Sequence, residues 1–261
     1  MTELLKGKTA IIYGGGGGIG GGVAKAFARE GAKVFLVGRT REKLDGVAKE
    51  IKSGGGSAEV AALDAMDEKA VDSHVEQVVS KTGRVDVSFN LINRGDVQGM
   101  PLVDMSTADL LRAVVSGLQS NFITARAAAR RMIRQKSGVI LHLNSASGDG
   151  AQPGMGSTGP ADAATESFMR YLAAELGPNG IRVCGIWTAG VAETLTQEKM
   201  GAVNENVPAV EQVKQMLAGM TALRRNVHLD DVAEVAAFLA SDRAAGITGT
   251  MVNVTSGLVL K

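Results

Sequence analysis

Features that direct many proteins to secretion, membranes or nucleic acids are missing from this sequence. It has one cysteine, which excludes an internal disulfide framework and is typical of a reducing compartment. No apolar run is long enough to span a bilayer, and the first ten residues, MTELLKGKTA, lack the apolar core of a secretion signal. Lys and Arg number 28 against 27 for Asp and Glu, so no strongly basic surface is indicated. We therefore expect a cytoplasmic protein without membrane or nucleic-acid partners.

Nothing in the sequence divides it into separate domains. The 261 residues could form two small domains or one large α/β domain. However, no Pro- or Ser-rich linker and no internal repeat interrupts them. With 45% hydrophobic and 21% charged residues, the composition is that of an ordinary globular protein. We predict a single domain spanning residues 1–261.

Short apolar segments alternate with longer amphipathic or alanine-rich ones. The apolar segments read as strands buried on both faces, at residues 9–13, 33–37, 58–63, 85–92, 139–143, 181–187 and 250–254. Helices are predicted at residues 19–30, 41–52, 67–82, 107–135, 161–176 and 230–240. This repetition predicts an α/β fold, a single Rossmann-type doubly wound domain with a seven-stranded, mostly parallel sheet and helices on both faces. Residues 193–228 break the alternation and are predicted to form a substrate loop or lid.

Glycine, by contrast, is abundant, and eight of the 34 glycines fall within YGGGGGIGGG at residues 13–22. A glycine inside a helix or strand costs about 0.5–1 kcal/mol relative to alanine, so this run indicates that side chains would obstruct a close approach. The run follows the first predicted strand and opens the first predicted helix, where free N–H groups and the helix dipole attract an anion. A flexible loop or a tight turn without a ligand is the alternative. A nucleoside-triphosphate P-loop is excluded, because no Gly-Lys-Ser or Gly-Lys-Thr follows.

The register of the glycine motif is set by segments elsewhere in the chain. Gly16, Gly18 and Gly21 fit one dinucleotide-binding pattern, whereas Gly14, Gly18 and Gly20 fit another. The second pattern, together with VGRTREKL, LDAMD, GVILHLNSASG, AAELGPNGIRV and GITGTMVNVTSG, resembles the classical short-chain dehydrogenase/reductase family. The resemblance covers essentially all 261 residues. It implies an oxidoreductase that uses a nicotinamide dinucleotide and acts on a small molecule.

The same resemblance implies which residues bind the cofactor. The diphosphate turn would comprise Gly14, Gly16, Gly17, Gly18, Ile19 and Gly20; Asp64 and Ala65 would meet the adenine, Asn90 the adenosine ribose, and Gly190, Val191 and Thr194 the nicotinamide amide. Two segments depart from the family's pattern, because NLIN replaces NNAG and an alanine replaces the proline before Gly190. No metal site is predicted.

The end of the second predicted strand indicates which cofactor is used. In dinucleotide-binding folds an acidic residue there binds the ribose 2′-hydroxyl of NAD, whereas an arginine accommodates the 2′-phosphate of NADP. Here Gly38 occupies the acidic position and Arg39 follows it. An arginine at a helix N-terminus opposes the helix dipole, which a phosphate ligand would explain, although solvated arginines are also common there. We predict NADP(H) in preference to NAD(H).

The positions that the resemblance assigns to proton transfer are largely changed. The family uses a serine, a tyrosine with a lysine four residues later, and an asparagine; this chain has Ser145, Thr158, Asp162 and Gly117 there. No shifted alignment recovers a tyrosine and lysine pair. An aliphatic hydroxyl is a far weaker acid than a phenol, and a carboxylate disfavours a nearby alkoxide. Two classes therefore stay open: a divergent oxidoreductase with an unusual proton donor, and a catalytically inactive dinucleotide-binding sensor or partner subunit.

Alanine-rich helix faces indicate self-association. The segments TARAAARRMI at residues 124–133 and ADAATESFMRYLAAEL at residues 161–176 permit close helix packing. In the family these two helices pair across two-fold axes. Alternatively, the alanines only pack each helix on its own sheet. We expect a homotetramer, or at least a dimer.

Overall fold

A computed structural model describes residues 3–150, 152–201 and 208–260. Seven strands form one sheet in the order β3-β2-β1-β4-β5-β6-β7, and every neighbouring pair is parallel. The strands are β1 (Thr9–Tyr13), β2 (Lys33–Gly38), β3 (Ser57–Ala62), β4 (Val87–Asn90), β5 (Gly138–Ser145), β6 (Ile181–Thr188) and β7 (Met251–Val254). The predicted doubly wound α/β fold is confirmed, and the expectation of a mostly parallel sheet becomes a fully parallel one.

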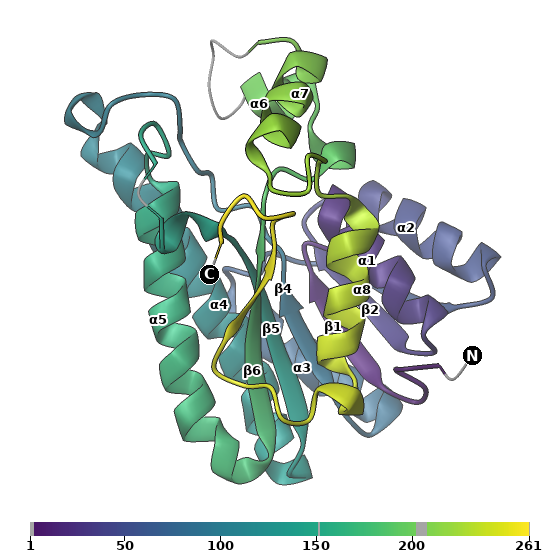
Figure 1. Cartoon of the computed structure of the whole chain (residues 1–261). Coiled ribbons are helices and arrows are strands. Elements are labelled where there is room, and N and C mark those ends of the chain that lie inside the picture. The colour runs from purple at the N-terminus through teal and green to yellow at the C-terminus, as the bar shows by residue number, and fades with distance from the viewer. Residues whose placement is uncertain (1–2, 151, 202–207, 261) are drawn as a thin grey trace.

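Helices cover both faces of this sheet (Figure 1). One face carries α1 (Gly18–Arg29), α2 (Arg41–Ser53) and α8 (Leu229–Ala240), and the other carries α3 (Glu68–Thr82), α4 (Thr107–Gln135) and α5 (Thr158–Leu176). Successive side chains of a strand point to opposite faces, so Ile12 of β1 joins the first apolar core and Ile11 joins the second. Strand β1, which lies between β2 and β4, is buried along its whole length.

A small helical lobe lies beyond the end of β6, above the sheet (Figure 1). It contains α6 (Gln197–Gly201) and α7 (Val210–Met220). Elsewhere along the chain there are short 3-10 helices, η1 (Leu102–Asp104), η2 (Ala146–Gly148), η3 (Gly177–Asn179), η4 (Ala192–Thr194) and η5 (Asp242–Ala244). Within the predicted lid, residues 202–207 lie outside the described residues. A parallel bridge between Val191 and Val227 ties the two ends of this segment together. No helix in the described part of the chain is long and apolar enough to cross a membrane.

Backbone packing at the carboxyl end of β1 requires two glycines of the run. Gly14 has a φ of 77°, and a Cβ there would lie 2.4 Å from the carbonyl oxygen of Leu91, just after β4. In α1, a Cβ on Gly20 would lie 2.2 Å from the carbonyl oxygen of Gly14. Real Cβ atoms essentially never approach other atoms this closely. The glycines therefore let α1 and the end of β4 pack directly against the first turn.

We expect Gly20→Ala to lower the free energy of unfolding by about 1–3 kcal/mol, because the added methyl group has no space. The matched control is Gly46→Ala, since Gly46 is exposed on α2 and a Cβ there would meet nothing within 4 Å. That control should stabilise the protein by about 0.5–1 kcal/mol, because alanine is the better helix former. Urea unfolding measures both values. A Gly20→Ala protein as stable as the wild type would show that α1 does not press on the turn.

Candidate active site

A cleft of about 590 Å³ runs along the carboxyl ends of the strands on one side of the sheet. Residues 37–40, 63–66 and 91–95, at the ends of β2, β3 and β4, line it together with the glycine turn. The strand order reverses beside it, because β1 lies between β2 and β4. Open parallel sheets bind ligands at such a switch point, outside the carboxyl ends of the strands. This cleft is the candidate binding site.

The N-terminus of α1 lies at this cleft. Gly17 is its N-cap residue, no side chain caps the helix, and its first turn contains no acidic residue. The first N–H groups and the positive end of the helix dipole are therefore free to bind an anion. Two side chains from the lobe lie against Gly18, whose Cβ would stand 2.8 Å from Thr194 Cγ2 and 3.4 Å from Lys199 Nζ. The Lys199 ammonium adds a positive charge that the sequence analysis did not anticipate.

The end of β2 provides two further cations. Gly38 leaves the usual acidic position without a side chain, and Arg39 and Lys43 line the cleft beside it. Both are exposed, and neither forms an ion pair within the described part of the chain. Arg41, by contrast, is paired with Asp45 at 3.0 Å. The part of the cleft beside the end of β2 therefore carries two positive charges, and the usual carboxylate is absent there.

Of the other residues predicted to bind the cofactor, two line the same cleft and the rest lie at or behind the glycine turn. Asp64 and Ala65 line it, and Asp64 also accepts a hydrogen bond from the backbone of Met66 at 2.9 Å. Ile19 packs on the first apolar core behind the turn. The segment after β6 that carries Gly190, Val191 and Thr194 reaches the turn through the contact of Thr194 with Gly18.

Asn90 ends β4, as its predicted position requires, but its side chain points into the protein. Its Nδ2 donates to Ser120 Oγ at 3.2 Å and to Thr124 Oγ1 at 3.4 Å, both on α4. Its Oδ1 accepts a hydrogen bond from the backbone N–H of Ile92 at 3.1 Å. The Asn90 side chain therefore fixes the end of β4 to α4.

Two of the three polar residues predicted for catalysis, Ser145 and Asp162, meet between the end of β5 and the start of α5. The Ser145 hydroxyl donates to Asp162 Oδ2 at 2.5 Å. The other carboxylate oxygen, Oδ1, accepts from Arg94 Nη1 at 2.7 Å, and Arg94 Nη2 donates to Asp96 Oδ1 at 2.8 Å. Asp162 is fully buried, whereas Ser145 is half-buried. A continuous polar chain thus runs from Ser145 through Asp162 to Arg94 and Asp96.

Arg94 and Asp96 are not among the site residues predicted from the sequence. Both belong to the segment NRGDVQ, residues 93–98, directly after the fourth strand. The carboxyl ends of parallel strands share one edge of the sheet, so charged residues at this position are a signal that could have identified them. The structure adds that Arg94 lines the binding cleft while its guanidinium reaches Asp162.

Thr158, the third predicted catalytic residue, is covered by the loop between β4 and α4. It is 3% exposed, and its hydroxyl accepts a hydrogen bond from Gln98 Nε2 at 2.8 Å. Beside it, Ser157 and Val97 are joined by two hydrogen bonds, of 3.1 and 3.2 Å. Of the three predicted catalytic residues, only Ser145 keeps appreciable exposed surface.

Gly117, on α4, makes room for the Arg94 side chain. A Cβ at this position would lie 2.7 Å from Arg94 Cδ. Any larger residue would therefore fill the space through which the arginine reaches Asp162. Gly117, Asp162 and Arg94 thus fit one another in space.

Burial and neighbouring charges shift the pKa values of Asp162 and Arg94, the two residues at the centre of this cluster. Burial raises the pKa of Asp162 from 3.8 to about 6, against the opposing effects of Arg94 and the Ser145 hydrogen bond. Burial opposes the charge on Arg94, but the Asp96 and Asp162 carboxylates outweigh it and raise the pKa of this guanidinium. Arg94 is therefore a permanent cation, whereas Asp162 titrates near neutrality.

In the described part of the chain, the two tyrosines and His142 form no hydrogen bond with this cluster. Tyr13 is completely buried, which raises the pKa of its phenol, and Tyr171 is 72% exposed on α5. His142 binds the Cys184 carbonyl oxygen through Nδ1 at 3.2 Å, and burial lowers its pKa to about 4. The described residues contain no group of three or more His, Cys, Asp or Glu side chains that could hold a metal ion.

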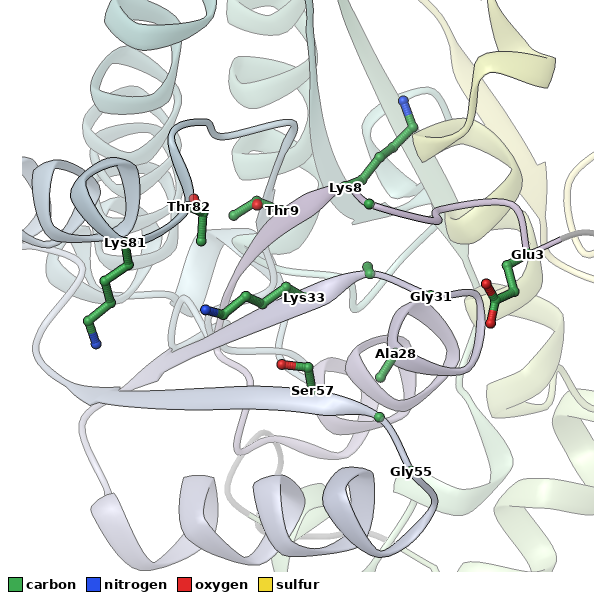
Figure 2. Close-up of a pocket in the computed structure, with 13 residues that line it drawn as sticks. Glu3, Lys8, Thr9, Ala28, Gly31, Lys33, Gly55, Ser57, Lys81 and Thr82 are labelled. Carbon is green, nitrogen blue, oxygen red and sulfur yellow. The ribbon is translucent and has the colours of Figure 1, made fainter.

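A second depression, of about 440 Å³, lies at the opposite edge of the sheet, where β1, β2 and β3 begin (Figure 2). Lys8, Lys33 and Lys81 border it. Each forms an ion pair, because Lys33 and Lys81 share Glu59 and Lys8 pairs with Asp242. These three lysines therefore differ from Arg39 and Lys43 in the cleft at the carboxyl edge, which form no ion pair within the described residues.

The fold and the cleft together define a Rossmann-type α/β protein of the dinucleotide-binding class, with a helix N-terminus at its switch point. A family model described as enoyl-(acyl carrier protein) reductase matches residues 15–259. The chain belongs to the short-chain dehydrogenase/reductase family of oxidoreductases.

Relatives of known name are similar over nearly their whole length. The 3-oxoacyl-(acyl-carrier-protein) reductase FabG of Thermotoga maritima is 30% identical over 256 residues, which is 98% of this chain and 99% of the relative. The 7alpha-hydroxysteroid dehydrogenase of Escherichia coli is 30% identical over 253 residues, or 97% of this chain and 94% of the relative. Among solved structures, carveol dehydrogenase from Mycobacterium avium in complex with NAD matches with a TM-score of 0.90 at 25% identity, covering 99% of both chains.

We expect Gly117→Ala to lower the free energy of unfolding by about 1–3 kcal/mol, because its methyl group collides with Arg94. In an Arg94→Ala background the same substitution should instead stabilise the protein by up to about 1 kcal/mol, since alanine favours the helix. Urea unfolding of the four proteins yields the coupling free energy between the two positions. Additive effects would contradict the contact.

Proposed function

We propose that this protein is an NADP(H)-dependent oxidoreductase that transfers a hydride between the cofactor and a small-molecule substrate. The cleft at the switch point, with the free N-terminus of α1 at its wall, is the observation that carries this proposal. Family membership supports a nicotinamide dinucleotide. The names of relatives, a 3-oxoacyl reductase and dehydrogenases of a hydroxysteroid and of carveol, support a carbonyl or alcohol as the reacting group.

The cofactor fits the residues that line the cleft. In this proposal the diphosphate lies on the glycine turn, with Lys199 nearby; the adenine meets Asp64 and Ala65, Asn90 fixes the wall beside the adenosine ribose, and Gly190, Val191 and Thr194 hold the nicotinamide amide. When bound, the cofactor supplies the hydride. The residues of this chain bind it and orient it toward the substrate.

The preference for NADP(H) rests on the end of β2. Gly38 leaves space for a 2′-phosphate, and Arg39 and Lys43, which form no ion pair with any described residue, supply two cations to bind it. Hydrogen bonds between arginine and phosphate are charge-assisted and stronger than neutral ones. NAD(H) has no phosphate for these cations and would find no carboxylate for its ribose hydroxyl.

The catalytic centre departs from that of the family in this proposal. Thr158 and Asp162 stand where the family has tyrosine and lysine, and Gln98 covers the threonine. This observation favours a second candidate function, a catalytically inactive dinucleotide-binding sensor or partner subunit. We also propose a cytoplasmic location, which the single free and buried Cys184 fits.

We expect NADPH to bind more tightly than NADH, and Arg39→Ala to weaken NADPH binding by about 10-fold or more, since a hydrogen bond to a charged group contributes about 1.5–3 kcal/mol. NADH binding should hardly change. The matched control is Arg41→Ala, because Arg41 is already paired with Asp45. Titration calorimetry measures all affinities, and equal affinities of the wild type for both cofactors would contradict the preference.

The same preparations separate the enzyme from the sensor. NADPH oxidation is followed by absorbance in the presence of ketones, aldehydes, enones and imines. Oxidation that depends on one of these substrates supports the oxidoreductase. Tight NADPH binding without oxidation in any mixture supports the sensor.

We further propose a homo-oligomer, a tetramer or at least a dimer, built on α4 and α5. Large apolar side chains are exposed on these helices, with Phe122 43% and Tyr171 72% accessible. Light scattering should therefore show a dimer or tetramer, and Phe122→Glu or Tyr171→Glu should shift it toward the monomer, because a charge would be buried. Met216→Glu, at an exposed position of α7, is the control and should leave the size unchanged. A monomeric wild type at micromolar concentration would contradict the assembly.

A further inference from the structure

Hydrogen-bond capacity limits what Ser145 can offer a substrate. A serine hydroxyl has one hydrogen and two lone pairs. Ser145 Oγ accepts from the backbone N–H of Ser147 at 3.2 Å, and its hydrogen is given to Asp162 at 2.5 Å. While Asp162 is ionised, Ser145 therefore retains one lone pair, which can accept a hydrogen bond from an alcohol. It has no hydrogen left for a carbonyl oxygen.

Protonation of Asp162 reverses this arrangement. A protonated carboxyl group donates its own hydrogen to Ser145, so both serine lone pairs are filled and the serine hydrogen is free to point outward. Ser145 is the half-buried member of the pair, while Asp162 has no exposed surface. Any exchange of a proton between Asp162 and a substrate must therefore pass through the Ser145 hydroxyl.

We propose that Asp162 stores the proton of the reaction and exchanges it with the substrate oxygen through Ser145. In reduction, a bound cofactor would supply a hydride to the substrate carbon, and the carbonyl oxygen takes the Ser145 hydrogen. The Oγ–H bond of Ser145 is re-formed with the proton of Asp162, which is left as a carboxylate beside Arg94. Alcohol oxidation runs the same transfers in reverse. This route rests on the proposed oxidoreductase function, and it assigns the proton donor that the sequence left open.

Arg94 is the positioning residue of this route. It binds Asp162 Oδ1 and leaves Oδ2 directed at Ser145. Its positive charge stabilises the carboxylate that forms when the proton leaves. Gly117 provides the space that the arginine needs. A buried aspartate without this cation would hold its proton too firmly to release it near neutral pH.

The charges around Asp162 fix the direction of the pH dependence. Arg94 and Asp96 approach it from the loop after β4, and Glu166 lies one turn further along α5, where it accepts hydrogen bonds from Asn144 and Trp187. His142, on β5, stays neutral above about pH 5, because burial lowers its pKa to about 4. Asp162 itself, with a pKa of about 6, is mostly protonated below that pH and mostly ionised above it. Carbonyl reduction should therefore be favoured below pH 6 and alcohol oxidation above it.

The first test measures the proton on Asp162 directly in the full chain with NADP⁺ added. Carboxyl carbons of 13C-labelled aspartate are followed by NMR between about pH 4 and pH 8, and Asp162→Asn identifies the signal. We expect a midpoint near 6 that rises by about one unit or more in Arg94→Gln and changes little in Arg94→Lys. Asp45→Asn, an exposed site, is the control. An Asp162 that stays ionised throughout this range overturns the proposal.

The second test measures whether that proton reaches a substrate. NADPH oxidation is measured against a panel of ketones and aldehydes, and the wild-type rate should fall about tenfold per pH unit above 6. Asp162→Asn and Ser145→Ala should each lose about 10²–10⁴-fold in rate, and the remaining rate should no longer follow this pH dependence. Their NADPH affinity should be unchanged, which separates loss of proton transfer from misfolding.

The outcomes distinguish this route from the proposed function. A wild type that does not bind NADPH defeats the proposed function, whatever Asp162 does. NADPH binding with no turnover of any panel member supports the sensor and overturns the proton route as well. Turnover that is equal in wild type and Asp162→Asn, with the same pH profile, overturns the proton route alone. The proton route is supported if both Ser145→Ala and Asp162→Asn lose rate. In addition, Arg94→Lys should keep the rate of NADPH oxidation, whereas Arg94→Gln should lose it.

Discussion

Backbone segments meet at the carboxyl end of β1 at distances that leave no room for a side chain. Gly14 lies against the carbonyl group of Leu91, and Gly20 of α1 lies against the carbonyl group of Gly14. This contact brings the N-terminus of a helix to the point where the strand order reverses. The loops after β2, β3 and β4 converge on the same edge because all the strands are parallel. The glycine turn and these loops together line the cleft.

The buried polar cluster of Arg94, Asp96 and Asp162 is a second constraint on the structure. A buried carboxylate at position 162 is costly unless a cation accompanies it, and a buried arginine is costly without carboxylates. Arg94 meets both requirements, because Asp162 and Asp96 bind its two terminal nitrogens. It can do so only because residue 117 has no side chain. The cluster is therefore a set of mutually dependent residues: loss of Arg94 would leave two carboxylates without their cation, and a side chain at position 117 would collide with the arginine.

The elements of the fold were predictable because they depend on local patterns. Strands buried on both faces need continuous apolar runs, and the helices between them need amphipathic ones, so strands such as β1 and helices such as α4 lie where they were predicted. The turn at residues 14–20 was predictable because only glycine tolerates such packing. The conformation of the loop after β4 could not be predicted from the sequence, because this loop has no periodic pattern. Its packing on α5, which covers Thr158, depends on contacts between segments about 60 residues apart.

The sequence by itself determined the order of strands and helices, the glycine turn, the family, and the positions at which Ser145 and Asp162 stand. Only the tertiary structure decided which groups those side chains contact. Ser145 and Asp162 are 17 residues apart, and Arg94 and Asp162 are 68 apart, so these contacts exist only once β4, β5 and α5 are packed together. Burial then raises the pKa of Asp162 to about 6 while Arg94 limits the rise. The sequence shows that residue 162 is an aspartate, but its protonation depends on the tertiary structure. Folding removes solvent from the carboxyl group and brings other charges close to it, and both effects shift its pKa.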